Sequence, residues 1–480
     1  MFQKHFFQWS IPAILETISK SIVLVVSIIF LEKIEFGIIT AAMLIFTYHP
    51  FLSLGITDGL MIKLPGYYIK NRTKDIISTL SISRIYVISI ISFLFLITLI
   101  FYIFFDSNLF LYVALIYGLS TIPYQYYYHY LLLNRFTYSF DITQKSRLLI
   151  VFVRLFIQIP LLIKFGLMGV VFGELIVYSL AALYIRYLSK LNLQLYFDKS
   201  LFKKILFFGL PILFVNLFGT LAATMEKLVS SIFLDFESIA NVGALTFIGS
   251  IFLIISSQLL SLFSQYSREF IVEKPKQTKI LFRSYIAFTH FSVVAYILFS
   301  AILFSILEKY IIPVFAKNYY EIIVLFPIIF VLFYLRIFIA SMINFLLILG
   351  ERTKIALSHF LLIFSSSVAI FINTFINEIN FSINTFLISI TFGAIIQLIF
   401  CLYIANKIVK TNIESVWISF STILLILFGL TMYIEIFDNW IICGTIFSIL
   451  FAIVQFWFLN LKKLSMVMTD LISLLKKEYL

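Results

Sequence analysis

The sequence predicts an all-α integral membrane protein with about 14 transmembrane helices. Its 480 residues are 62% hydrophobic and only 12% charged, and its mean hydropathy of +1.08 lies far above that of soluble domains. Apolar stretches of about 20 residues recur along the chain, each long enough to cross a hydrocarbon core of roughly 30 Å. A membrane β-barrel would instead alternate apolar and polar residues in shorter segments, and this sequence lacks that pattern.

Short polar loops separate the predicted spans. These spans cover residues 10–31, 37–57, 79–104, 109–132, 148–163, 166–185, 205–233, 240–265, 284–307, 321–347, 355–374, 382–405, 415–434 and 440–460. Lysine and arginine concentrate in alternate loops, including 190–204 and 268–283, whereas the opposite loops hold only Lys33, Lys164, Lys309 and Lys317. Cytoplasmic loops are the basic ones in membrane proteins, so both termini are expected in the cytoplasm.

The composition argues against several other classes of protein. The net charge of +12 comes from these loops and not from one soluble basic face, so no nucleic acid is expected as a partner. The two cysteines, Cys401 and Cys443, lie apart in apolar runs, which predicts neither a disulfide framework nor a metal site. No glycine-rich phosphate loop or nucleophile triad is visible, so we expect no enzyme chemistry and no cofactor.

The chain contains a weak internal sequence repeat. Residues 10–15 (SIPAIL) resemble residues 209–214 (GLPILF), and residues 29–32 (IFLE) resemble residues 232–235 (IFLD). Six spans separate the two copies, so both enter from the same side of the membrane and the repeat is parallel. We expect an N-lobe at 1–190, a C-lobe at 191–410 related to it by a pseudo-twofold axis, and two further helices with a cytoplasmic tail at 411–480. Chance similarity between Ile/Leu/Phe-rich segments is the alternative.

Charged and polar side chains follow helical spacing inside several spans. Glu16 and Lys20 share one face of span 1, and Arg154 and Gln158 share one face of span 5. Charges at membrane depth are costly and commonly face a partner or a wet cavity. The cations and amides predicted to bind substrate in a cationic central cavity are Lys20, Arg154, Lys227, Arg336, Asn216 and Asn344.

Three acids at membrane depth, Glu16, Glu174 and Glu226, are candidates for ion coupling. Glu16 and Glu226 could instead neutralise Lys20 and Lys227, whereas Glu174 has no evident partner near it in the sequence. Arg84 lies near the end of its span and is expected to extend to the interface. For Arg154, the same behaviour and a cavity-lining role remain open alternatives.

The segment 30–65, FLEKIEFGIITAAMLIFTYHPFLSLGITDGLMIKLP, resembles the opening of polysaccharide-exporting flippases of the multidrug/oligosaccharidyl-lipid/polysaccharide superfamily. The similarity lies in Glu35-Phe36-Gly37, in Leu54-Gly55-Ile56 with Asp58-Gly59, and in the basic loop that follows. The second lobe's Glu226-Lys227 departs from the Asp-Arg pair that is common in that family.

This resemblance implies a flippase that moves undecaprenyl-diphosphate-linked oligosaccharide, such as an O-antigen unit, across a bacterial inner membrane. Its partners would be that lipid-linked sugar, the membrane lipids and the polysaccharide polymerase machinery. A cation-coupled multidrug antiporter of the same superfamily is the first alternative, although its cavity should be acidic. A polysaccharide polymerase or glycosyltransferase is the second, and the short outward loops argue against it.

Overall fold

The computed structural model describes residues 2–56, 59, 73–104, 109–136, 139–189, 198–250, 307–315, 317–373 and 382–409, together with single positions between 278 and 306. These residues form helices and turns without any strand, as predicted for an all-α membrane protein. The chain divides into two compact units, Met1–Gly243 and Ala244–Leu480. The predicted spans at 415–434 and 440–460 lie outside the described residues.

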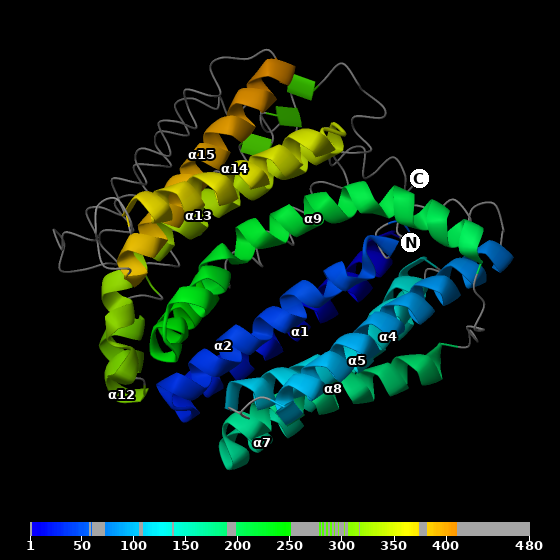
Figure 1. Cartoon of the computed structure of the whole chain (residues 1–480), viewed down its shortest axis with the longest axis horizontal. Coiled ribbons are helices and arrows are strands. Elements are labelled where there is room, and N and C mark those ends of the chain that lie inside the picture. Colours follow the sequence, from blue (N-terminus) through cyan, green and yellow to red (C-terminus); the bar gives the residue numbers. More distant parts are fainter. Residues whose placement is uncertain are drawn as a thin grey trace. The chain divides into compact units, whose positions relative to one another are not determined.

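The long helices of the first unit run side by side (Figure 1). In chain order its elements are α1 (Phe2–Phe30), α2 (Lys33–Tyr48), the 3-10 turn η1 (His49–Ser53), α4 (Thr73–Phe104), α5 (Leu109–Phe136), α6 (Phe140–Val153), the π-helix η2 (Arg154–Gln158), α7 (Ile159–Phe165), α8 (Leu167–Leu188) and α9 (Lys199–Phe233). Residues 236–250 form a further helix. The contacts of α5 with α2, α4 and α8 build the hydrophobic core of this unit.

The described helices of the second unit begin with a short irregular stretch and continue with three long helices. They are the π-helix η4 (Leu307–Ile311), α12 (Ile312–Phe315), η5 (Lys317–Tyr319), α13 (Glu321–Ile348), α14 (Arg352–Phe371) and α15 (Ile383–Val409). The helix α15 packs on both α13 and α14. Because α13 is apolar on all sides, it is buried along most of its length.

Eight helices within the described residues are long and apolar enough to cross a membrane. They cover Ile11–Phe30, Lys33–Phe51, Phe140–Phe165, Leu167–Leu188, Lys199–Phe233, Glu321–Ile348, Arg352–Phe371 and Ile383–Val409. Each overlaps a predicted span, and several begin earlier than expected. The largest difference is in span 5, which begins at Phe140 and not at residue 148.

The two acids of the internal sequence repeat, Glu32 and Asp235, both lie directly before a helix. Glu32 precedes α2, and its backbone N–H donates to the Glu35 carboxylate at 3.2 Å. Asp235 precedes the 236–250 helix, and its carboxylate accepts from the Ser238 backbone N–H at 2.9 Å. The Ser238 side chain and backbone lower the pKa of Asp235, because both stabilise the ionised carboxylate. Both acids thus lie directly before a helix, and the repeat itself stays a prediction.

Candidate functional site

The helix that forms span 5 is interrupted by one π turn. Its regular hydrogen bonding stops at Val153 and resumes at Ile159, whose backbone N–H donates to the carbonyl of Arg154. The two ends of this turn carry Arg154 and Gln158, and both side chains are buried. Single π turns inside α-helices occur frequently at functional sites.

Arg154 lies at the centre of a buried polar network. One of its guanidinium nitrogens, Nη2, lies 3.1 Å from Glu174 Oε1 and donates to the hydroxyl of Tyr178 at 2.9 Å. The other, Nη1, donates to the backbone carbonyl of Glu16 at 3.4 Å. Only 1% of Arg154 is exposed, so this residue connects α1, span 5 and α8 and does not extend to the interface.

Both carboxylate oxygens of Glu174 accept hydrogen bonds from side chains of span 5. Its second oxygen, Oε2, accepts a hydrogen bond from Gln158 Nε2 at 3.0 Å. Gly173 makes this approach possible, because a Cβ at that position would lie 2.5 Å from Gln158 Cγ. The partners of Glu174, Arg154 and Gln158, come from a different helix and are distant in sequence, which is why no partner was evident near it in the sequence.

Glu16 and Lys20 on α1 lie beside this network. The Glu16 carboxylate is 3.6 Å from Nε of Arg147, a residue that lies just before the predicted start of span 5 at residue 148. Lys20 lies within electrostatic range of Glu16, Glu174 and Arg154, yet its side chain is exposed. The cluster thus holds three cations and two carboxylates, and each arginine already faces a carboxylate.

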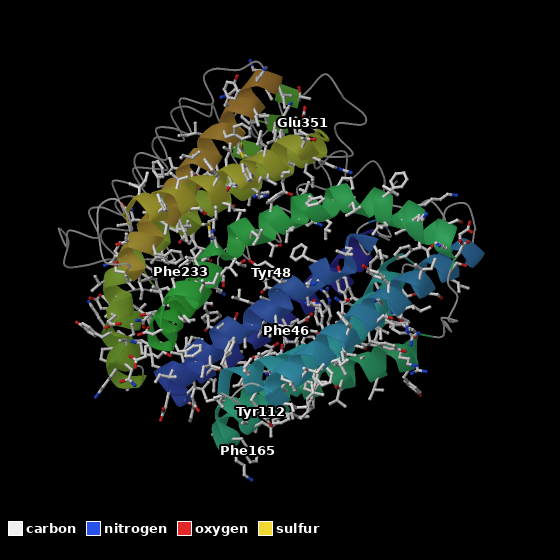
Figure 2. All side chains as sticks on the ribbon, in the orientation of Figure 1. Phe46, Tyr48, Tyr112, Phe165, Phe233 and Glu351 are labelled. Carbon is white, nitrogen blue, oxygen red and sulfur yellow. The ribbon has the colours of Figure 1, made fainter. Side chains whose placement is uncertain are left out.

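The predicted polar stripe of span 7 lies on α9 and contacts α2. The Tyr48 hydroxyl is 2.7 Å from the hydroxyl of Thr224, and Figure 2 shows Tyr48 between the two helices. Glu226 is buried, with 2% of its surface exposed, whereas Lys227 is half-buried and Asn216 is exposed.

Two further membrane cations contact aromatic rings. Arg84 lies 4.6 Å from the centre of the Tyr126 ring and donates from Nη2 to that residue's hydroxyl at 3.0 Å. In the second unit, Arg336 is 9% exposed and lies 5.0 Å from the centre of the Phe333 ring. About two turns further along the same helix, the Asn344 side chain donates back to the Ala340 carbonyl at 2.8 Å.

Sequence reasoning missed Arg147 and Tyr178 as members of the network. A signal for both was present, because Tyr178 follows Glu174 by one helical turn and Arg147 precedes Arg154 by two. Within the described part of the chain, no group of three His, Cys, Asp or Glu side chains is placed to hold a metal ion.

Comparison with solved structures places this fold among known transporters. The chain is similar to the lipid II flippase MurJ in its inward closed conformation, with a TM-score of 0.66 and 15% sequence identity over 93% of this chain and 98% of that one. It is also similar to an inward-facing multidrug resistance MATE family transporter of the MOP superfamily, with a TM-score of 0.61 and 14% identity over 83% of this chain and 96% of the other. The chain therefore shares its fold with these transporters.

The outward-facing conformation of a multidrug resistance MATE family transporter matches less closely, with a TM-score of 0.53 at 16% identity over 85% of this chain and 97% of that chain. No protein-family model matches the sequence. No curated protein matches it either. The multi-pass helical fold predicted from sequence is thus confirmed, whereas the substrate has to be argued from the site.

Proposed function

We propose that this protein is a flippase that moves undecaprenyl-diphosphate-linked oligosaccharide across a bacterial inner membrane, and that Lys20 binds the diphosphate. The charge balance beside α1 carries this proposal. Arg147 and Arg154 each face a carboxylate, so Lys20 supplies the one excess positive charge of the cluster, and its side chain is the exposed one.

An excess cation at membrane depth favours an anionic ligand. Placing a lysine near the bilayer centre costs at least about 2.5–3.5 kcal/mol, and a phosphate oxygen that binds the ammonium group offsets this cost through a charge-assisted hydrogen bond. The polyprenyl chain can remain in lipid while the sugars cross through the protein. The similarity of the fold to a lipid II flippase agrees with such a lipid-linked substrate.

The other predicted residues take distinct roles in this proposal. Lys227 and Asn216 on α9 are proposed to extend the headgroup site, and Arg336 and Asn344 are proposed to bind substrate within the second unit. Arg154 instead holds α1 and α8 in place and does not touch the substrate. Among the acids, Glu16 is the candidate best placed to exchange a proton, because 22% of its side chain is exposed against 8% for Glu174. Glu226 is the corresponding candidate on α9.

The fold also favours one alternative, because MATE multidrug transporters share it. A cavity for cationic drugs should carry excess acid, and the cluster beside α1 carries excess base. An antiporter would therefore gain from replacement of Lys20 by a neutral residue, whereas a flippase for a lipid diphosphate would lose activity.

The proposal is tested by Lys20→Ala in cells whose own polysaccharide flippase has been deleted. Loss of a charge-assisted hydrogen bond worth about 1.5–3 kcal/mol should weaken headgroup binding about ten- to hundredfold, so surface polysaccharide should fall steeply at unchanged protein abundance. Lys20→Arg should retain part of the activity. Lys164→Ala, which removes an exposed lysine at the end of α7, is the matched control. Full export by Lys20→Ala would refute the proposed site.

A further inference from the structure

Tyrosines are concentrated on one segment of α5, where they make up five of the seven residues from Tyr124 to Tyr130. Tyr124 and Tyr128 are one helical turn apart and therefore share a face of the helix. Their rings are stacked, with centres 6.2 Å apart and planes inclined by 12°. Both side chains are half-buried, so part of each ring remains accessible. This pair is called the tyrosine platform.

The platform lies inside the first unit. The Tyr124 ring makes edge-to-face contacts with three other rings. Its centre is 4.7 Å from that of Tyr178, 4.9 Å from that of His49 and 5.8 Å from that of Phe46. Phe46 lies on α2 (Figure 2), His49 in η1 and Tyr178 on α8. A ring enclosed by three other elements of its own unit does not face lipid, so the accessible part of Tyr124 borders the inside of this unit.

One buried polar atom beside the platform lacks a hydrogen-bond partner. His49 is only 4% exposed, and its Nδ1 lies 2.6 Å from the carbonyl oxygen of Phe46. Its other ring nitrogen, Nε2, is buried and makes no hydrogen bond within the described part of the chain. Buried polar atoms are almost always paired in proteins. An unpaired one next to an accessible ring indicates a place where a hydroxyl group of a ligand can bind.

The charged cluster of α1 lies next to the platform. Tyr124 is within electrostatic range of Glu16 and Arg147. Glu16 is in turn one helical turn from Lys20, the residue proposed to bind the diphosphate. The ion pair of Glu16 and Arg147, at 3.6 Å, supplies both an acceptor and donors for hydroxyl groups. Aromatic rings and polar groups therefore meet within a short distance of the proposed diphosphate site.

We propose that the tyrosine platform binds the sugar that is joined directly to the diphosphate. This inference rests on the proposed function, because Lys20 holds the diphosphate beside the platform. A pyranose ring has apolar C–H groups on its faces and hydroxyl groups at its edge. The C–H groups pack on Tyr124 and Tyr128, and the hydroxyls bind His49 Nε2 and Glu16. A polyprenyl chain or an apolar drug at the same place would leave these polar atoms unpaired.

Binding of matched lipids in a sugar-free detergent tests this proposal. The probes are undecaprenyl diphosphate and the same lipid carrying glucose, galactose or N-acetylglucosamine. The parent protein should bind at least one sugar-bearing lipid about tenfold more tightly than the sugar-free lipid. Tyr124→Leu should remove this difference and leave the affinity for undecaprenyl diphosphate unchanged, whereas Tyr124→Phe should preserve it. Tyr112→Leu, at another half-buried tyrosine of α5, is the matched control.

Two results would overturn the platform. One is equal affinity of the parent protein for the sugar-free lipid and all three sugar-bearing lipids. The other is an equal loss of affinity for every probe in Tyr124→Leu, because a merely structural role would act on all of them alike. Tyr128→Leu provides the same comparison where Tyr124→Leu is not abundant.

Free methyl glycosides of the same three sugars separate this inference from the proposed function. In saturation-transfer NMR, ring protons of at least one glycoside should receive magnetisation from the parent protein and much less from Tyr124→Leu. Such a signal in a protein that does not bind undecaprenyl diphosphate would support the platform and count against the proposed substrate. Binding of undecaprenyl diphosphate that Lys20→Ala abolishes, with no effect of Tyr124→Leu on any probe, would support the substrate and overturn the platform.

Discussion

Single residues within the membrane are paired by the fold in a manner that their sequence spacing does not reveal. The sequence identified Arg154, Glu16 and Glu174 as charges that need partners. It could not show that Arg154 binds Glu174, because the pair joins two helices through a π turn and a neighbouring glycine. The i, i+4 spacing suggested that Glu16 neutralises Lys20, whereas in the structure the Glu16 carboxylate forms an ion pair with Arg147.

Arg154→Ala should act on folding and not on substrate binding. It leaves the Glu174 carboxylate buried without its cation, which costs about 3–5 kcal/mol in a buried site. We expect a clear loss of abundance in the membrane and of thermal stability in detergent. The double variant Arg154→Met/Glu174→Leu should regain much of that stability, since it removes both charges together.

Lys20→Ala provides the contrast to Arg154→Ala, because its exposed side chain should leave abundance and melting temperature unchanged. If Arg154→Ala were as abundant and stable as the parent protein but inactive in export, the structural role assigned to Arg154 would be wrong. That result would return Arg154 to the set of residues that bind substrate.

At the scale of helices, hydrophobic runs predicted the spans well because a membrane span must be apolar over about 20 residues. Boundaries were less accurate at polar ends, and Arg147 was placed just outside span 5 because helix α6 begins with polar residues. The π turn at 154–158 and the 3-10 turn at 49–53 depend on how neighbouring helices pack, so hydropathy alone could not predict them.

Gly173→Ala should weaken the contact between α8 and the π turn. The new methyl group would lie 2.5 Å from Gln158 Cγ and 3.3 Å from its Cα, and overpacking of this kind costs about 1–3 kcal/mol. Thermal unfolding in detergent should show a lower melting temperature than that of the parent protein.

Gly118→Ala is the control for this substitution, because open space surrounds that position. Alanine is favoured over glycine within a helix by about 1 kcal/mol, so Gly118→Ala should be neutral or stabilising. A stabilising effect of Gly173→Ala equal to that of Gly118→Ala would show that the close approach of Gln158 is not required.

At the scale of the whole molecule, the sequence predicted the transporter fold from its apolar spans and its resemblance, and the solved structures agree. The division at residues 190 and 410 and the pseudo-twofold axis remain predictions. Spans rich in Ile, Leu and Phe resemble one another and carry little information about how the lobes meet, so hydropathy locates the spans more reliably than the lobe boundaries.

The orientation predicted from basic loops can be measured with single cysteines. Glu237→Cys, exposed in the first turn of the 236–250 helix, should react with an impermeant thiol reagent on intact cells. Lys203→Cys, exposed at the start of α9, should react only after the membrane is opened. The reverse pattern would invert the orientation and place both termini outside the cytoplasm.

The most direct test of the central claim is flipping in reconstituted proteoliposomes. The vesicles would contain the purified protein and a fluorescent undecaprenyl-diphosphate oligosaccharide, and an impermeant quencher would report how much of the label reaches the outer leaflet. The account predicts protein-dependent flipping that Lys20→Ala abolishes and Lys164→Ala preserves. Absence of flipping by the parent protein in vesicles where it exchanges a cationic drug for protons, or equal flipping by Lys20→Ala, would contradict it.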